Sequence, residues 1–185
     1  DEFPSDFQIN RKPLLFAGLL NHWGTKGPAE LSSKRLFSYR HVQWLAGKLG
    51  VPLLFPEKHP FNPITLLRLC IAANCSKKAV DAIFNCVWVE GLSGDDPANW
   101  TRFCEAVKIS EPEASEKISS PEIKQELKLN GEEALEQGVF GVPTLVMDKN
   151  LFWGLDTTDM AIEYLSDPKL FVSSEMKRLE TLPGY

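Results

Sequence analysis

The segment from Gly138 to Met147, GVFGVPTLVM, places a proline at the start of a predicted buried strand. Proline cannot donate a hydrogen bond to a sheet ladder, so it is confined to strand starts, edges and bulges. A cis Val142–Pro143 bond, uncommon enough to be a deliberate feature, would turn the preceding N–H and C=O groups outward. These groups could then pair, as a strand does, with the backbone of a peptide thiol. The alternative is an ordinary trans proline at a strand edge.

The cysteines and histidines of the chain do not form a metal or redox motif. Cys70 and Cys75 are five residues apart, which is not a zinc-binding spacing, and no CxxC pair occurs. All four cysteines fall in helical patterns beside apolar neighbours: Cys70, Cys75, Cys86 and Cys104. We expect reduced, mostly buried thiols in a reducing compartment. The three histidines have no spacing that suggests a metal site or a triad, so no metal is expected: His22, His41 and His59.

Composition places the chain among ordinary globular proteins. Its 185 residues are 43% hydrophobic and 24% charged, enough for one domain with a sizeable core or a domain with a large insertion. The net charge of -5 argues against a nucleic-acid partner, which needs a basic face. No run of 18 apolar residues is present, which argues against a membrane span. No targeting segment is visible, and we expect a cytoplasmic protein.

The chain passes from one predicted strand through a long helical block to a hairpin and a last helix. The apolar run Pro13–Leu20 is interpreted as a buried strand, and a helix that Ser32 or Ser33 caps, ending at Gly50, carries one apolar stripe. The stripe consists of Leu36, Tyr39, Val42, Leu45 and Leu49. Further helices are predicted to begin at Asn62–Pro63, Ser76, Asp96–Pro97 and Ser120–Pro121. Strands Thr144–Met147 and Leu151–Trp153 and a helix Thr157–Leu165 follow.

This element order indicates the fold. A strand begun by proline, a second strand and a helix are typical of the second half of a thioredoxin-like fold. We therefore predict an α/β protein with a thioredoxin-like core, residues 1–30 and 138–185, and a large all-helical insertion, residues 31–137. Only one strand precedes the helical block, so the N-terminal strand and helix of the core are expected to be missing from this chain.

Five motifs spread along the chain carry a resemblance to a known family. They are SSKRLFSYRHVQWLAGKLGVPLLFP, HPFNPITLLRL, AIFNCVWVEG, PEIKQELKLNGEEALEQGVFGVPTLV and LFWGLD. In this order, from about Phe7 to Leu165, the sequence resembles the bacterial 2-hydroxychromene-2-carboxylate isomerases. These belong with the kappa-class glutathione transferases and DsbA-like proteins. Their fold is a thioredoxin-like core with an inserted helical domain.

The resemblance implies glutathione as cofactor and places its binding residues. The Val142 backbone beside Pro143 would pair with the cysteinyl unit, and Asp156 would accept a hydrogen bond from the α-ammonium group. The free N–H groups at the start of the following helix would hold the glutamyl carboxylate. A segment near the γ-glutamyl end completes this side of the site: Trp153, Gly154, Leu155 and Asp156. Asp156 as a helix cap is the alternative. Lys34 is expected near glutathione or an acidic substrate, or else is a solvated lysine.

The resemblance also leaves gaps. Family members carry a thiol-activating serine after their first strand, and this chain has no matching segment, since Ser5 lies in the wrong context. The catalytic residue is therefore unassigned and expected upstream of residue 1. Thr25 and Thr157 also differ from the family pattern, which leaves the substrate open. Trp23 and Phe61 are candidate pocket walls and His59 a candidate neighbour of the site, although such residues are more often core.

The predicted function is a glutathione-dependent cis-trans isomerisation of a small aromatic carboxylate, carried out by a homodimer. The alternatives are a kappa-like glutathione transferase and a non-catalytic binding protein of the DsbA family.

Overall fold

The computed structural model describes residues 7–183, which form two compact units. Among these residues, the smaller unit consists of residues 7–9 and 141–183, and the larger, helical unit of Asn10–Phe140. Residues 10–30, which the predicted boundaries place with the core, therefore lie in the helical unit. Within the described residues, no helix has the length and apolar character needed to cross a membrane.

The smaller unit is built on an antiparallel hairpin. Strand β1 (Thr144–Met147) pairs with β2 (Asn150–Trp153), with Thr144 opposite Trp153 and Met147 opposite Asn150. The turn residues Asp148 and Lys149 both have positive φ, 48° and 72°, as a two-residue hairpin turn of the primed kind requires. The short 3₁₀-helix η3 (Leu155–Thr157) and helix α8 (Thr158–Ser166) follow. Both predicted strands and the last predicted helix are confirmed.

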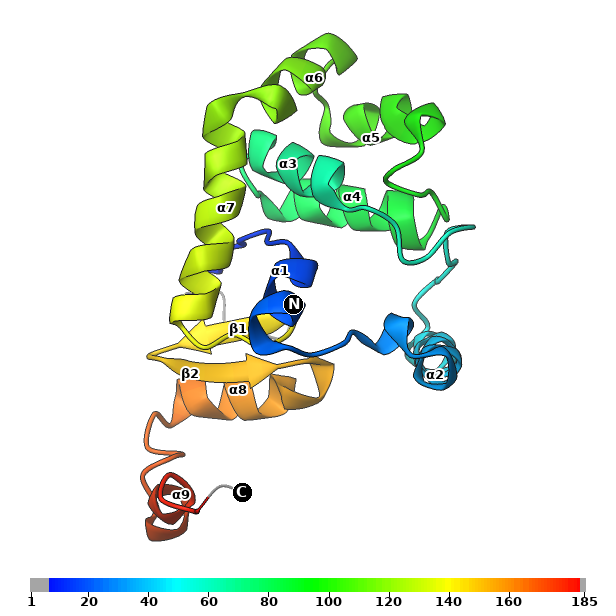
Figure 1. The fold of residues 1–185 in the computed structure, drawn as a ribbon. Helices are drawn as coiled ribbons and strands as arrows, with labels where there is room; N and C mark the ends of the chain where they lie inside the picture. Colours follow the sequence, from blue (N-terminus) through cyan, green and yellow to red (C-terminus); the bar gives the residue numbers. More distant parts are fainter. Residues whose placement is uncertain (1–6, 184–185) are drawn as a thin grey trace. The chain divides into compact units, whose positions relative to one another are not determined.

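Helix α8 packs on one face of the hairpin (Figure 1). Phe152 of β2, only 1% exposed, meets Ala161 and Tyr164 of α8, and Leu145 and Met147 of β1 border this cluster. A further helix, α9 (Ser174–Leu179), was not expected from the sequence. The hydrophobic cluster fixes the hairpin that carries the candidate site.

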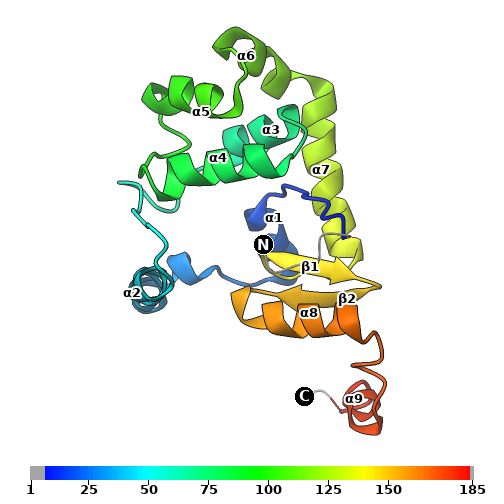
Figure 2. The ribbon, with the colours of Figure 1, turned by 180° about the vertical axis from the view of Figure 1, so that it is seen from behind.

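The helical unit has its own core, formed by side chains of α3 to α6, helices that Figure 2 shows next to one another. Its largest fully buried side chains on these helices are Leu69, Cys86, Phe103 and Cys104. The predicted cap Ser76 accepts a hydrogen bond from the Ala79 N–H at 3.2 Å, and Ser120 accepts one from Ile123 at 3.3 Å. The elements are α1 (Phe16–Trp23), η1 (Pro28–Glu30), α2 (Ser32–Leu49), α3 (Ile64–Ala72), α4 (Lys77–Trp88), η2 (Pro97–Asn99), α5 (Trp100–Val107), α6 (Glu111–Ser119) and α7 (Pro121–Glu136).

The strand predicted at Pro13–Leu20 is wrong, because this apolar run enters helix α1 at Phe16. Leu19 is 1% exposed, and Gly24, with φ of 63°, ends the helix in a left-handed cap. A continuous apolar run of this length has no periodicity that separates a buried strand from a buried helix. The glycine cap was the signal that favoured a helix.

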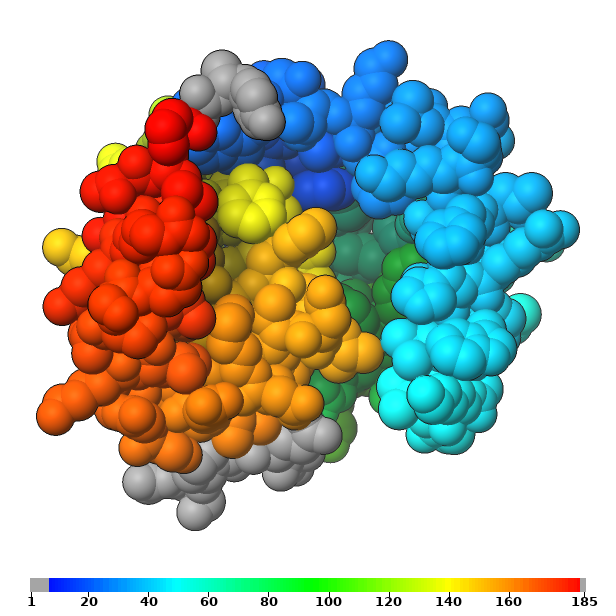
Figure 3. Space-filling model, turned by 90° about the horizontal axis from the view of Figure 1, so that it is seen from below, coloured from blue at the N-terminus to red at the C-terminus, as the bar shows by residue number. Residues whose placement is uncertain are grey.

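Helix α2 begins where the sequence predicts but differs in two respects. Its N-cap is Leu31, and no side chain caps it, so the predicted serine cap is wrong. The predicted apolar stripe is also not buried, since Leu36, Val42 and Leu49 are 52%, 44% and 56% exposed. Figure 3 shows the side chains of this segment, in blue to cyan, at the surface. Apolar periodicity alone therefore did not predict burial here.

Candidate functional site

The Val142–Pro143 peptide bond is cis, as expected from the sequence, and Pro143 lies just before β1. The Gly154 N–H donates a hydrogen bond to the Pro143 carbonyl at 2.9 Å, directly beyond the Thr144–Trp153 pair. In an antiparallel ladder, two residues at this position exchange both hydrogen bonds. Proline has no N–H, so the second bond cannot form, and the Gly154 carbonyl instead accepts from the Thr157 hydroxyl at 3.3 Å. The ladder therefore ends at Pro143.

Val142, just before the end of the ladder, has a backbone that is not used by the fold. Within residues 7–183, neither its N–H nor its C=O has a hydrogen-bond partner, and the residue is 41% exposed. Buried backbone groups are almost always hydrogen-bonded within the protein, whereas exposed ones can form hydrogen bonds with a ligand or with water. Val142 thus offers a free backbone donor and acceptor. An extended peptide could form main-chain hydrogen bonds with both, as a neighbouring strand does.

Gly141 is a part of this site that the sequence analysis missed. A Cβ atom at Gly141 would lie 3.0 Å from Cε2 of Trp153 and closer still to its indole nitrogen. The Gly141 carbonyl also accepts a hydrogen bond from the Thr144 hydroxyl at 2.7 Å. Glycine at this position therefore leaves room for the half-exposed Trp153 indole, whose nitrogen side lies against the Gly141 backbone. The GxP spacing before the strand was the signal that could have indicated this close approach.

Gly154 connects the same corner to Asp156. Its φ of 85° is in the region that favours glycine, and a Cβ there would lie 2.6 Å from Oδ1 of Asp156. Asp156 is exposed and caps neither η3 nor α8, whose N-cap residues are Gly154 and Thr157. The helix-cap alternative is therefore not supported. Leu155, 62% exposed, lies between Gly154 and Asp156.

The smaller unit thus brings six of the seven predicted site residues onto one corner of the hairpin. These are Val142, Pro143, Trp153, Gly154, Leu155 and Asp156. Lys34 belongs to the helical unit, where it is exposed in the first turn of α2. Its role toward glutathione or substrate stays a prediction, as does the role of the other six in binding glutathione.

The three other candidates lie in the helical unit and have structural partners there. The Trp23 indole donates to the Val139 carbonyl at 3.0 Å, and Phe61 packs on the main core cluster. His59 Nδ1 lies 2.7 Å from the Tyr39 hydroxyl, and its ring meets Trp88 edge-on. Burial lowers the pKa of His59 below its ordinary value, which favours a neutral ring at pH 7.

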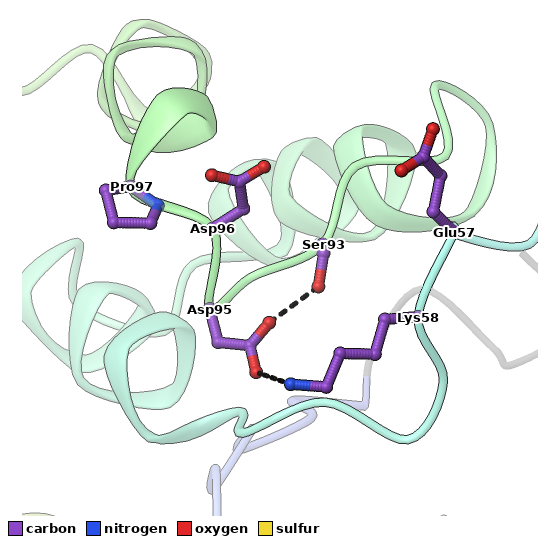
Figure 4. A pocket seen from close by; sticks show the side chains of 6 residues that line it. All are labelled: Glu57, Lys58, Ser93, Asp95, Asp96 and Pro97. Carbon is purple, nitrogen blue, oxygen red and sulfur yellow. Dashed lines mark hydrogen bonds and ion pairs between the residues drawn. The ribbon is translucent and has the colours of Figure 1, made fainter.

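A polar pocket of about 330 Å³ in the helical unit is organised around Asp95 (Figure 4). The carboxylate accepts hydrogen bonds from the Ser93 hydroxyl at 2.7 Å, the Asn62 N–H at 3.1 Å and Lys58 Nζ at 3.1 Å. These bonds, that of Ser93 first, lower the pKa of Asp95 to about 2. Both carboxylate oxygens are therefore used in hydrogen bonds that join residues 58–62 to residues 93–95, and we assign this cluster a structural role.

Comparisons with known proteins agree with this architecture. A solved 2-hydroxychromene-2-carboxylate isomerase superposes with a TM-score of 0.70 and 24% identity over 90% of this chain and 85% of the other, which shows the fold. The sequence is 27% identical over 147 residues to the 2-hydroxychromene-2-carboxylate isomerase of Sphingobium xenophagum, covering 78% of this chain and 75% of that protein. It is 24% identical over 179 residues to glutathione S-transferase kappa 1 of Homo sapiens, covering 88% and 79%.

The predicted thioredoxin-like fold and the predicted resemblance are thereby confirmed. The sequence pattern of the DSBA-like thioredoxin domain matches residues 2–166, which is most of the chain. This protein therefore belongs to the DSBA-like thioredoxin domain family.

Proposed function

We propose that this protein is a glutathione-dependent isomerase that acts on a small aromatic carboxylate of the 2-hydroxychromene-2-carboxylate type. Its similarity to two isomerases of that name, from Sphingobium xenophagum and Pseudomonas putida, supports the reaction class. The observation that carries the glutathione site is the unpaired Val142 backbone beside Pro143.

The residues of the hairpin corner fit a γ-glutamyl tripeptide. The N–H and C=O of Val142 would pair with the backbone of the cysteinyl unit, since both groups are exposed and unpartnered within the described residues. The Asp156 carboxylate, which has no other partner there, would accept a hydrogen bond from the α-ammonium group. The Trp153 indole would form an apolar wall beside the tripeptide, held in place by its contact with Gly141.

The chemistry requires a thiolate, because the thiol itself is a poor nucleophile. Bound glutathione would supply a sulfur that adds to a conjugated carbon of the substrate and later leaves it. While the sulfur is attached, the former double bond is a single bond, and the two parts of the substrate can rotate about it. The chain's own part is to fix the backbone of the tripeptide and to keep the substrate beside it.

A kappa-like glutathione transferase is the second candidate, favoured by the similarity to the human kappa enzyme over 88% of this chain. Both candidates use the same hairpin corner for glutathione and differ in the acceptor. An isomerase returns glutathione unchanged, whereas a transferase consumes it in a conjugate. Measuring free thiol during turnover therefore distinguishes the two candidates.

The test follows absorbance of 2-hydroxychromene-2-carboxylate with and without glutathione, and titrates free thiol at the end. We expect isomerisation that needs glutathione and leaves the thiol concentration unchanged. Isomerisation of equal rate without glutathione would overturn the cofactor. Conjugation of an electrophile such as 1-chloro-2,4-dinitrobenzene, with no isomerisation of the chromene acid, would favour the transferase instead.

A further inference from the structure

Two thiols meet at the C-terminal end of α3, in the helical unit. The Cys75 N–H donates to the Cys70 carbonyl at 2.9 Å, and the Asn74 N–H donates to Ile71 at 2.8 Å. Asn74 has a φ of 59° and follows the helix C-cap at Ala73. This pair of hydrogen bonds around a left-handed residue is a Schellman motif, which frequently brings the side chains at these two positions together. Here the two thiols are hydrogen-bonded to each other. Both residues pack on the same core cluster.

The two thiols differ in access to solvent. Cys70 is 7% exposed and belongs to the core, whereas Cys75 is only half-buried. The residues on both sides of Cys75 in the sequence, Asn74 and Ser76, line a surface pocket of about 340 Å³. A small reagent from solvent therefore has better access to Cys75 than to Cys70.

The electrostatic environment has the same asymmetry. A hydrogen bond from the Cys70 thiol lowers the pKa of Cys75, although burial and the charge of Glu126 oppose this effect. The same hydrogen bond, together with burial, raises the pKa of Cys70. Cys75 therefore has the thiolate character that governs attack on oxidants, and Cys70 is the adjacent protonated partner.

The other two cysteines provide internal references. Cys86 is 0% exposed, and burial raises its pKa. Cys104 is 1% exposed, and burial raises its pKa to about 11. Both should be unreactive in the folded protein, because oxidation follows thiolate character and exposure.

We propose that Cys75 is a peroxide-reactive thiol and that Cys70 resolves it, forming a disulfide across the end of α3. The Cys75 thiolate attacks one oxygen of a hydroperoxide, the O–O bond breaks, and a sulfenic acid and one hydroxide or alkoxide ion result. The Cys70 sulfur then attacks the Cys75 sulfur, the S–O bond breaks, and water leaves with the Cys70 proton. Two thiols are oxidised to one disulfide, and the peroxide is reduced by two electrons.

This site is independent of the hairpin corner. It lies entirely in the helical unit, whereas the proposed glutathione-binding residues other than Lys34 lie in the smaller unit. On this proposal, an oxidant modifies the helical unit covalently and reversibly, by forming a disulfide. The product closes a ring around the left-handed turn that already holds Cys70 and Cys75 together.

Tryptic peptides separate the cysteines cleanly. Cleavage after Arg68 and Lys77 releases LCIAANCSK, which contains both Cys70 and Cys75, whereas Cys86 lies in peptide 79–102 and Cys104 in peptide 103–108. The folded protein is treated with hydrogen peroxide, the remaining thiols are alkylated under denaturing conditions, and the peptides are weighed. We expect LCIAANCSK to appear two hydrogen atoms lighter and without alkyl groups, because a disulfide blocks alkylation. Its oxidation should be at least about tenfold faster than the oxidation of Cys86 or Cys104.

Variants test the order of the two steps. In Cys70→Ala, dimedone should trap a sulfenic acid on Cys75. In Cys75→Ser, the peptide should stay reduced, and Cys104→Ala, a matched buried control, should oxidise like the unaltered protein. Circular dichroism checks that each variant is folded. Loss of Cys75 no faster than Cys86 in the unaltered protein, or no dimedone adduct in a folded Cys70→Ala, would overturn the proposal, as would a disulfide that forms only between chains.

Discussion

The Gly154 N–H lies 2.9 Å from the Pro143 carbonyl and donates a hydrogen bond to it. This bond joins two segments that the family resemblance assigns separately to glutathione binding. It is the last bond of the hairpin ladder, because Pro143 has no N–H with which to return a second one. The two segments are therefore fixed to each other while the backbone of Val142 stays outside the sheet.

Replacing Asp156 by alanine should weaken glutathione binding without affecting the fold. The carboxylate is exposed and has no partner in the described part of the chain, so its removal leaves no buried group unpaired. A hydrogen bond to a charged group contributes about 1.5–3 kcal/mol, which is the expected loss of binding free energy. Isothermal titration calorimetry measures it.

Asp159→Ala is the matched control for this experiment. Asp159 is also an exposed aspartate, and it lies one turn later, in the first turn of α8. Equal affinities of the Asp156 variant and the unaltered protein would remove Asp156 from the site. Equal losses in the two variants would indicate a general effect of charge on the binding of a peptide.

Gly141→Ala should displace the Trp153 indole and thereby weaken glutathione binding, and it should lower the free energy of unfolding by up to about 1–3 kcal/mol, the usual cost of overpacking. The new Cβ would overlap the indole, which is half-exposed and can swing outward. A shift of the Trp153 indole N–H resonance, assigned with Trp153→Phe, reports the movement. Gly131→Ala in α7 is the control, because a Cβ there meets nothing within 4 Å.

An unchanged Trp153 resonance in Gly141→Ala would show that the indole does not rest on Gly141. The Gly131 variant should leave both the resonance and the affinity unaltered. Its helix should become more stable by about 0.5–1 kcal/mol, because alanine replaces glycine in a helix interior.

Much of the hairpin corner could be predicted from the sequence, since its signals are local. Pro143 at the head of β1 and the turn at Asp148 and Lys149 define the strands, and the predicted cis bond is confirmed. Gly141 was missed because its role depends on where the Trp153 indole lies after the strands have paired. Pairing register can be inferred from a short turn, but side-chain contacts beyond the last pair cannot.

The helical unit was predicted less completely, for related reasons. Proline and serine caps marked α3, α4, α5 and α7, whereas the apolar run before α1 had no period that excluded a strand. The stripe on α2 was predicted from spacing alone, and spacing does not tell whether another element covers it. The thiol contact at Cys70 and Cys75 requires the left-handed turn at Asn74, and an asparagine directly after a helical pattern was the signal that could have indicated this turn.

Asp95→Asn should destabilise the protein near neutral pH and have little effect in strong acid. The pKa of Asp95 is lowered from 3.8 to about 2 by its hydrogen bonds with Ser93, Asn62 and Lys58. A carboxyl group with a lowered folded-state pKa stabilises the fold above its ordinary pKa, and this contribution is lost as the pH falls towards the lowered value. The difference between the two proteins should therefore shrink as the pH falls from 3.8 to about 2.

Urea unfolding at a series of pH values measures this difference. Glu57→Gln is the control, because Glu57 lines the same pocket but makes no ion pair or hydrogen bond within the described residues. A destabilisation by Asp95→Asn that is the same at every pH would mean that the charge of Asp95 is not involved. A comparable effect of Glu57→Gln would point to the net charge of the pocket.

The backbone of Val142 is the most direct place to test the account, because its N–H and C=O are the groups proposed to hold glutathione. The measurement is a titration of the ¹⁵N-labelled protein with glutathione, followed through the assigned amide resonances. The account predicts a large, saturable shift of the Val142 amide as it gains a hydrogen bond, with smaller shifts at Gly141 and Asp156. Saturable binding that leaves the Val142 amide unmoved, or no binding at all, would contradict it.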